Sequence, residues 1–128
     1  MLKIKSYVKV KSIAEAYELN QKKTALVLGG MVWLKMGNRN ISTAIDLSGL
    51  GLDTVQETDD EFVIGCMATL RDLEVHPGLN AYTDGAVKQS VCHIVGVQFR
   101  NCATVGGSIY GRFGFSDVLT LFAALDCY

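Results

Sequence analysis

The sequence predicts an α+β fold in two lobes: a small βαβ lobe over residues 1–57, then the incomplete first part of a second α/β lobe over residues 58–128. Strand-like apolar runs alternate with a helical segment in the first part of the chain, which favours parallel pairing. An acidic turn, Asp59-Asp60, precedes a second part whose apolar residues recur at helical spacing. A glycine-dense stretch over residues 100–114 then leads to a last apolar run.

The first lobe begins with a strand and a helix. Residues 7–11 alternate apolar and charged side chains, which is typical of a half-buried strand. Ser12 is followed three residues later by Glu15, and this capping-box pattern predicts a helix that runs to about Asn20.

Two further strands complete this lobe. The compact apolar run Thr24–Leu28 ends at Gly29-Gly30, and Ile41–Leu47 is a second run rich in β-branched residues. Between them, Met31–Lys35 is long enough for one helical turn. The predicted order is therefore strand, helix, strand, short helix, strand.

The second lobe is expected to be mainly helical. Glu61–Cys66 predicts a strand, and Thr69 begins a short helix that His76-Pro77-Gly78 closes. Asn80–Val95 carries apolar residues at helical spacing and predicts one longer helix, and Val118–Leu125 predicts another. The chain ends directly after this last run, so we expect it to be a fragment of a longer domain.

Composition excludes several classes of function. A hydrophobic content of 49% in 128 residues is enough for an ordinary core, and 12 basic against 13 acidic residues leave no positive surplus to attract nucleic acid. No uninterrupted apolar run is long enough to span a membrane. Four scattered cysteines without metal-ligand spacing favour reduced thiols in the cytoplasm and no metal site.

Two glycine-bearing segments are candidate phosphate loops. Gly29-Gly30 follows a strand, where backbone N–H groups without Cβ bulk can converge on an anion; the alternative is an ordinary tight turn. Thr104-Val105-Gly106-Gly107-Ser108 places two hydroxyls around two glycines, and Asp117 begins a helix ten residues beyond Gly107. Its alternative is a β-bulge or hairpin in which Thr104 and Ser108 satisfy only backbone groups.

The motifs resemble a known family when they are taken in order. Residues 100–109, R-N-C-A-T-V-G-G-S-I, followed by Ser116-Asp117, are similar to the R-N-x-G/A-T-I/V-G-G-N-I…D signature of the flavin domain of molybdopterin dehydrogenases, the xanthine dehydrogenase and CO dehydrogenase flavoprotein family. Residues 28–35 resemble that family's A-G-G-T-D-L-L loop, and residues 44–48 its I-D-L-S strand. Residues 64–70, with His76-Pro77 behind them, resemble its I-G-A-x-T-L…H-P segment.

The resemblance implies a function for the whole set. It implies the PCMH (vanillyl-alcohol oxidase-like) fold, with non-covalent FAD between the two lobes, and it implies no proton-transfer catalyst in this chain. It further implies a partner subunit with the molybdenum cofactor, a partner subunit with [2Fe-2S] clusters, and NAD or another electron acceptor. The residues expected to bind FAD are Val27, Leu28, Gly29, Gly30, Met31, Val32, Trp33, Ile94, Thr104, Gly106, Gly107, Ser108 and Asp117.

The chain departs from the family pattern at three of these positions. Met31 and Val32 replace the usual Thr and acidic residue, which removes a side-chain hydroxyl from the phosphate loop. Ser108 replaces the usual Asn and shortens the reach of a polar side chain. The backbone of both loops is unaffected by these changes.

Individual side chains carry competing expectations. For Trp33 we favour core packing over stacking on a flavin or adenine ring, and for His93 a buried, hydrogen-bonded position over a role as general base. Arg100 is expected to anchor the second loop by donating to carbonyls rather than to contact a ligand. The aromatic and basic residues Tyr110, Arg112, Phe113 and Phe115 are expected to face a partner subunit or the flavin.

Two other functions compete with the flavoprotein reading. One is a non-catalytic nucleotide-binding or interaction module that has lost the flavin, which the replacement at Met31 supports. The other is an oxidase with covalently attached flavin, which is disfavoured because neither His76 nor His93 lies in a Gly-x-His loop.

Overall fold

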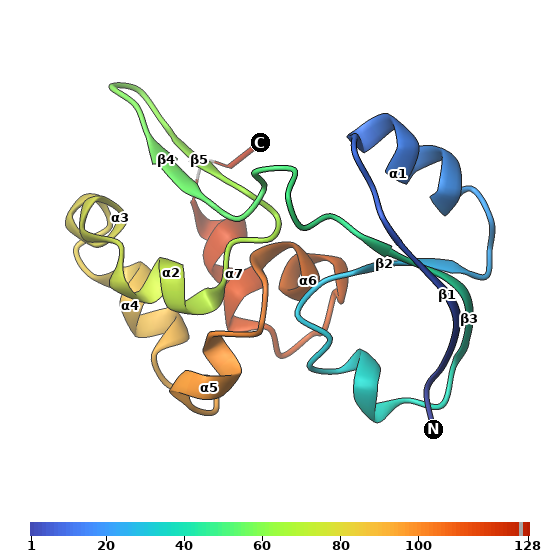
Figure 1. Cartoon of the computed structure of the whole chain (residues 1–128). Helices are drawn as coiled ribbons and strands as arrows, with labels where there is room; N and C mark the ends of the chain where they lie inside the picture. The colour runs from blue at the N-terminus through green and yellow to red at the C-terminus, as the bar shows by residue number, and fades with distance from the viewer. Residues whose placement is uncertain (126) are drawn as a thin grey trace.

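The chain folds into a small three-stranded sheet with one helix, packed beside a helical body. A computed structural model describes residues 1–125 and 127–128. In Figure 1 the sheet and α1 lie to the right and the helical body to the left, with α6 between them. The two-lobed α+β fold predicted from the sequence is confirmed.

The sheet has the parallel topology that the alternating pattern predicts. Strands β1 (Lys3–Lys9), β2 (Ala25–Leu28) and β3 (Asn40–Asp46) lie in the order β1-β3-β2, and β3 pairs in parallel with both neighbours. Helix α1 (Ile13–Asn20) connects β1 to β2, and the 3₁₀ helix η1 (Leu34–Met36) lies between β2 and β3. All three predicted strands and the first helix are present.

Burial of one sheet face holds α1 in place. Ser12 caps the helix by accepting from the Glu15 backbone N–H at 3.1 Å, as the capping-box pattern predicts. Ala16 then packs with Val10, Ala25 and the fully buried Ile45 in a small apolar core. The opposite face of the sheet, where β2 presents Leu26, borders the cavity between the two bodies.

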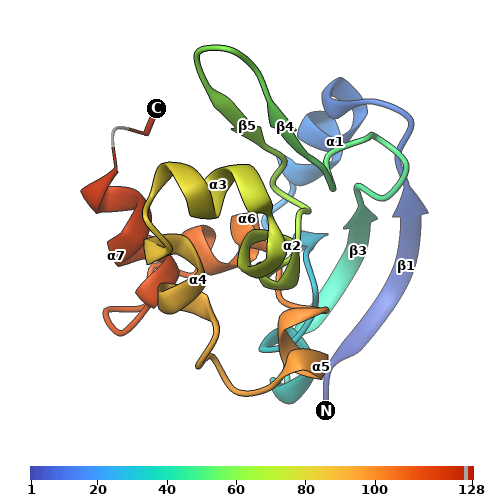
Figure 2. The same cartoon turned by 90° about the vertical axis from the view of Figure 1, so that its left-hand side faces the viewer.

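In the part of the chain that the structure describes, the second body consists of a short antiparallel hairpin and six helices. Strands β4 (Val55–Glu57) and β5 (Phe62–Ile64) pair across the acidic turn and project from the body in Figure 2; β4 was not predicted. The helices are α2 (Leu70–Val75), α3 (Pro77–Tyr82), α4 (Ala86–Val91), α5 (Val97–Arg100), α6 (Val105–Tyr110) and α7 (Asp117–Ala124). Their buried side chains form a second core that includes Leu70, Leu73, Val87, Val91 and Val118.

The single helix expected over Asn80–Val95 is wrong, because a turn at residues 83–85 divides the segment between two helices. Asp84 and Gly85 both have positive φ, which ends α3 and redirects the chain into α4. The Asn80 side chain accepts from the Lys88 N–H at 2.9 Å and donates to the His76 carbonyl at 2.8 Å, so it ties the two short helices together. The helical spacing of apolar residues is real, but two helices share it.

His76-Pro77-Gly78 also differs from its expected role as a closing turn. It ends α2, as predicted, but it begins α3 at the same point: Pro77 occupies the first helical turn, and the His76 Nδ1 accepts from the Leu79 N–H at 3.1 Å.

Within the described residues no helix is long and apolar enough to cross a bilayer.

The α2 face that enters the second core should dominate the stability of this body. Leu73→Ala removes a fully buried side chain and is expected to lower the free energy of unfolding by about 2–5 kcal/mol. Val75→Ala, on the exposed side of the same helix, is the matched control and should change it by no more than about 0.5 kcal/mol. Urea unfolding followed by circular dichroism measures the free energy of unfolding of both variants. Equal losses of stability would contradict the burial of Leu73 in the second core.

Candidate functional site

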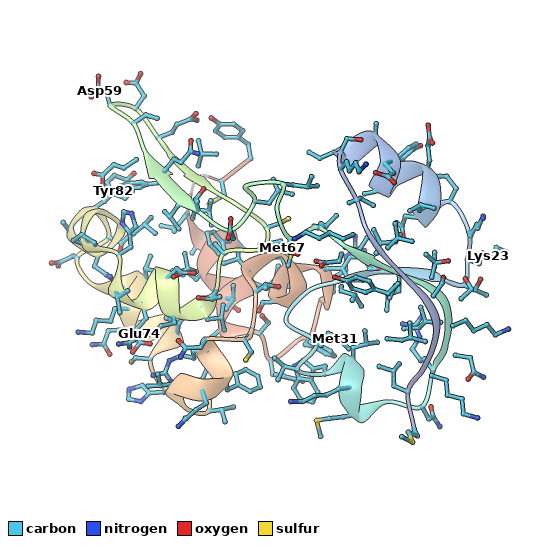
Figure 3. All side chains as sticks on the ribbon, viewed as in Figure 1. Lys23, Met31, Asp59, Met67, Glu74 and Tyr82 are labelled. Atoms are coloured by element: carbon cyan, nitrogen blue, oxygen red, sulfur yellow. The ribbon has the colours of Figure 1, made fainter. Side chains whose placement is uncertain are left out.

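The two glycine-bearing segments predicted from the sequence lie against each other. A Cβ atom built on Gly30 would lie 1.6 Å from the Cys102 carbonyl oxygen, and one on Gly29 would lie 2.8 Å from the Thr104 Oγ1 and 3.9 Å from the Gly107 Cα. No other residue type fits at Gly30 without moving the backbone, because the approach is backbone against backbone. Met31 follows this contact and lies between the two bodies in Figure 3.

The second segment forms the first turn of α6 rather than a bulge or hairpin. The Thr104 Oγ1 caps the helix by accepting from the Gly107 N–H at 3.2 Å, and the Ser108 hydroxyl donates to the Thr104 carbonyl at 2.9 Å. The Val105 N–H donates to Ala68 O at 2.9 Å, and the Gly106 N–H donates to Cys66 O at 2.8 Å. The amides of Val105 to Ser108 are therefore already bonded, and what the segment can still offer an anion is the N–H and the hydroxyl proton of Thr104, whose amide has no acceptor among the described residues.

The first segment has unused amides. The N–H groups of Gly30, Met31, Val32 and Trp33 have no acceptor among the residues that the structure describes. Met31 has a φ of +58°, a left-handed conformation that a side chain rarely adopts and that occurs in backbone anion-binding turns. An arrangement of this kind binds anionic oxygens through backbone dipoles without a lysine.

A cavity of about 560 Å³ opens between the two bodies at this contact, within the usual size range of small-molecule sites. Of the residues predicted to bind a cofactor, eleven line it: Val27, Gly29, Gly30, Met31, Val32, Trp33, Ile94, Thr104, Gly107, Ser108 and Asp117.

The other two predicted residues, Leu28 and Gly106, do not line the cavity. Leu28 is buried in the sheet. Gly106, in the first turn of α6, packs tightly against Cys66. Their support of the site is through packing.

Charge is sparse on the cavity wall. Among its described lining residues only Arg39 and Asp117 carry a formal charge. Asp117 is the first residue of α7, as predicted, where the helix dipole favours a carboxylate; Ser116 caps this helix by accepting from the Leu119 N–H at 3.1 Å. Arg39 was not predicted, since nothing in its local sequence distinguishes it from an ordinary surface arginine.

The core position expected for Trp33 is wrong. Its side chain is 56% exposed, and its ring lies 5.6 Å from Phe113 and 6.5 Å from Phe115 between centroids. Phe113 and Phe115 stack on each other at 5.3 Å with an interplanar angle of 18°. Segments 80 residues apart thus place three aromatic rings together on the cavity wall.

A buried ion pair fixes another part of the wall. The Arg100 guanidinium donates to both carboxylate oxygens of Glu74, at 2.7 Å and 3.2 Å, and to the Ile94 carbonyl at 3.2 Å. Arg100 thus donates to a carbonyl, as expected, but that carbonyl belongs to Ile94 and not to the second glycine-bearing segment that it was expected to anchor. Glu74 was missed because its partner is 26 residues away. The half-buried Arg71 adds a third cationic contact to Glu74 at 2.9 Å.

The loop that Arg100 holds lines the cavity under backbone strain. Ile94 and Val95 both line it, and Val95 has a φ of +53°, a costly conformation for a β-branched residue. His93, expected to be buried, is exposed beside this loop because the helix predicted to bury it ends at Val91.

The contact between the two glycine-bearing segments can be tested by adding one methyl group. Gly30→Ala should lower the free energy of unfolding by about 1–3 kcal/mol or more, since the new Cβ overlaps the Cys102 carbonyl oxygen. Gly114→Ala is the control: open space surrounds its Cβ position, and little change is expected. Thermal unfolding measures both variants. Equal losses of stability in the two would contradict the close approach of Gly30 to the Cys102 carbonyl.

The Glu74–Arg100 pair should make stability depend on pH. Hydrogen bonds from the Arg100 guanidinium, opposed by burial, hold the pKa of Glu74 below its usual value. The stabilisation is therefore complete above the unfolded-state pKa of about 4.3 and is lost as the pH falls through the lowered folded-state pKa.

Glu74→Gln should cost about 3 kcal/mol or more at pH 7, because it leaves the Arg100 charge buried without a counter-ion. The difference from the unmodified chain should narrow as the pH falls below about 4. Glu18→Gln, at an exposed position on α1, serves as the control. A gap for Glu74→Gln that stays constant from pH 7 to pH 3 in urea titrations would disprove the coupling.

Known structures share this architecture. The chain superposes on the Cu,Mo-CO dehydrogenase, cyanide-inactivated form, with a TM-score of 0.81 at 22% identity over 98% of this chain and 46% of that one. On the carbon monoxide dehydrogenase of Hydrogenophaga pseudoflava that lacks the Mo-pyranopterin moiety, the TM-score is 0.67 at 28% identity, covering 81% and 38%. Quinoline 2-oxidoreductase from Pseudomonas putida 86 gives 0.71 at 21% identity, again covering 81% and 38%.

The chain spans less than half the length of these neighbours. No curated protein sequence matches it significantly. The sequence model of the FAD binding domain in molybdopterin dehydrogenase, however, matches residues 2–128. The protein therefore belongs to the family of FAD-binding domains of molybdopterin dehydrogenases, as its ordered motifs indicate.

Proposed function

We propose that this chain is part of the flavoprotein subunit of a molybdenum hydroxylase, and that FAD lies in the cavity with its diphosphate between the Gly29–Trp33 loop and Thr104. One observation carries the proposal: a backbone contact that only glycine permits brings unused amides and a hydroxyl to one side of a cavity. The residues present fit a diphosphate, since consecutive free N–H groups suit anionic oxygens.

Each segment has its own part in holding the dinucleotide. The amides of Gly30 to Trp33 donate to the phosphate oxygens, and Thr104 donates its hydroxyl proton while its oxygen keeps the α6 cap. Asp117 lies at the cavity wall as an acceptor for a sugar hydroxyl or ring N–H. Val27 and Ile94 supply apolar surface. We further propose that residues 1–57 and 58–128 correspond to the two lobes between which the cofactor binds.

When bound, FAD supplies electron-transfer chemistry between the [2Fe-2S] clusters of one partner subunit and NAD or another acceptor, downstream of a molybdenum-binding subunit. The part of this chain is to bind and orient the cofactor, with no proton-transfer residue of its own. We place the assembly in the cytoplasm, which is consistent with the unpaired thiols of Cys66, Cys92 and Cys102.

A nucleotide-binding or interaction module without flavin is the second candidate. Two observations favour it: Met31 provides no hydroxyl where the family has Thr, and the amides of the first α6 turn are all internally bonded. Such a module would keep the loop contact for stability alone, and it would not respond to added FAD.

Titration of FAD into the 128-residue chain separates the two candidates. We expect binding with a dissociation constant above about 1 µM. A cavity open to solvent makes few contacts with the ligand, and these contacts must offset the entropic cost of association. Equilibrium dialysis measures the dissociation constant, with Glu18→Gln, at an exposed position on α1, as a control that retains binding. No binding up to millimolar FAD would favour the module, and submicromolar affinity would contradict the expected weakness.

A further inference from the structure

We propose that the free edge of β1 binds an acidic, extended segment of a partner protein, which adds to the sheet as a fourth strand. β1 is an edge strand, because the sheet order is β1-β3-β2 and β3 is the only strand of the described residues that pairs with it. In Figure 2 it forms the outer margin of the molecule. The inference goes beyond the proposed function and does not require FAD in the cavity.

The edge is long and uncovered. Six of the seven residues of β1 are exposed. Apart from β3, no helix or strand that the structure describes makes more than marginal contact with it. An uncovered edge strand presents backbone donors and acceptors without partners, and an extended peptide can bond to them by strand addition. The free edge of β1 is therefore long enough to hold an added strand.

The pairing with β3 shows which backbone groups point outward. The Lys3 N–H donates to the Arg39 carbonyl at 3.0 Å, at the start of β3. In a parallel ladder alternate residues direct their N–H and C=O groups to opposite sides of the strand. Ile4, Ser6 and Val8 therefore direct theirs away from β3. These are the three positions at which an added strand forms its hydrogen bonds.

Lysines occupy one face of the same strand. Val8 packs against the apolar core under α1. Because successive side chains of a strand point to opposite faces, Lys3, Lys5 and Lys9 lie on the other face. β1 contains no acidic residue, and no ion pair among the described residues involves its lysines. Cations at this spacing match an added strand that carries acidic residues at alternate positions.

The same lysines argue against a second copy of this chain as the occupant. Lysines on an edge strand usually prevent pairing between like edges. Two β1 strands side by side would place lysines against lysines, and like charges opposite each other are unfavourable. An acidic strand converts this repulsion into attraction, so the edge selects for an acidic segment.

The register also places the lysines relative to the cavity. Leu26, which borders the cavity, and Tyr7 both pair with Ala44, so these three side chains share one face of the sheet. The lysines of β1 lie on that face at its outer margin. An added strand therefore extends the sheet face that borders the cavity.

Amide hydrogen exchange on the ¹⁵N-labelled 128-residue chain tests the strand addition. The probe is a capped peptide of alternating Glu and Thr, about as long as β1, at millimolar concentration. The amides of Ile4, Ser6 and Val8 should exchange about tenfold more slowly at about 90% saturation, because only the free fraction of the chain exposes them. Saturable binding without added protection at these three amides would overturn the proposal, and so would an absence of binding.

Two further peptides test the sequence requirement of the edge. A peptide of the same composition, with its Glu and Thr residues in two separate blocks, keeps the charge and loses the alternation. It should bind at least about fivefold more weakly, because fewer of its carboxylates face the lysines. A peptide of alternating Lys and Thr should not bind. Equal affinity for the alternating and the block peptide would reject strand addition in favour of unspecific attraction.

A charge reversal tests the role of the lysines. Lys5→Glu should weaken binding of the alternating Glu and Thr peptide by about 5–20-fold, since it replaces an attractive cross-strand pair with a repulsive one. Lys88→Glu makes the same change in net charge at an exposed position on α4 and should stay within about twofold. Equal effects of the two substitutions would refute the proposal.

Two measurements keep the test decisive. Circular dichroism establishes that the Lys5→Glu chain is folded, and Lys3→Glu, at the first residue of the strand, replaces it if it is not. Sedimentation of the unmodified chain alone tests for a second copy at the edge. A concentration-dependent dimer that Lys5→Glu disrupts would assign the edge to self-association and overturn the proposal.

Discussion

The approach of the Gly29–Gly30 bend to the Cys102–Gly107 segment is the contact on which the site depends. It is a contact between backbones, because a single methyl group at Gly30 would overlap a carbonyl oxygen. The separation of the two backbones determines how closely the sheet packs on the helical body, and therefore how wide the cavity between them is. At this contact the Gly29–Trp33 loop keeps amides that have no acceptor among the described residues, and no side chain separates the loop from the opposing backbone.

The two segments at that contact do different work. The α6 turn uses its amides internally, bonding to Cys66 O, Ala68 O and the Thr104 side chain, so it is a rigid support. The Gly29–Trp33 loop leaves its amides unbonded and accepts strain at Met31. A rigid support beside a strained, unsatisfied loop is an arrangement typical of ligand sites, where backbone strain is stored and compensated elsewhere.

The Glu74–Arg100 pair extends this support to the far wall. Both side chains are buried, at 7% and 5% exposure, and the described residues contain no buried side-chain polar atom without a partner. Through the Ile94 carbonyl the pair restrains a loop that also contains a strained valine. The interior of the helical body therefore fixes part of the cavity lining, although neither charged side chain lines it.

The sequence by itself determined what local patterns can encode: the parallel strands, the Ser12 cap, the helix that starts at Asp117, and the ordered glycine motifs that identify the family. Apolar spacing could not show that residues 80–95 form two helices, because the break lies in the left-handed turn at Asp84 and Gly85 and is held by hydrogen bonds of the Asn80 side chain. Tertiary structure alone decided that Trp33 meets Phe113 across 80 residues, that Glu74 pairs with Arg100, and which amides stay free. The physical reason is that these features are distances between distant segments, and such distances are set by packing of the whole chain rather than by any local propensity.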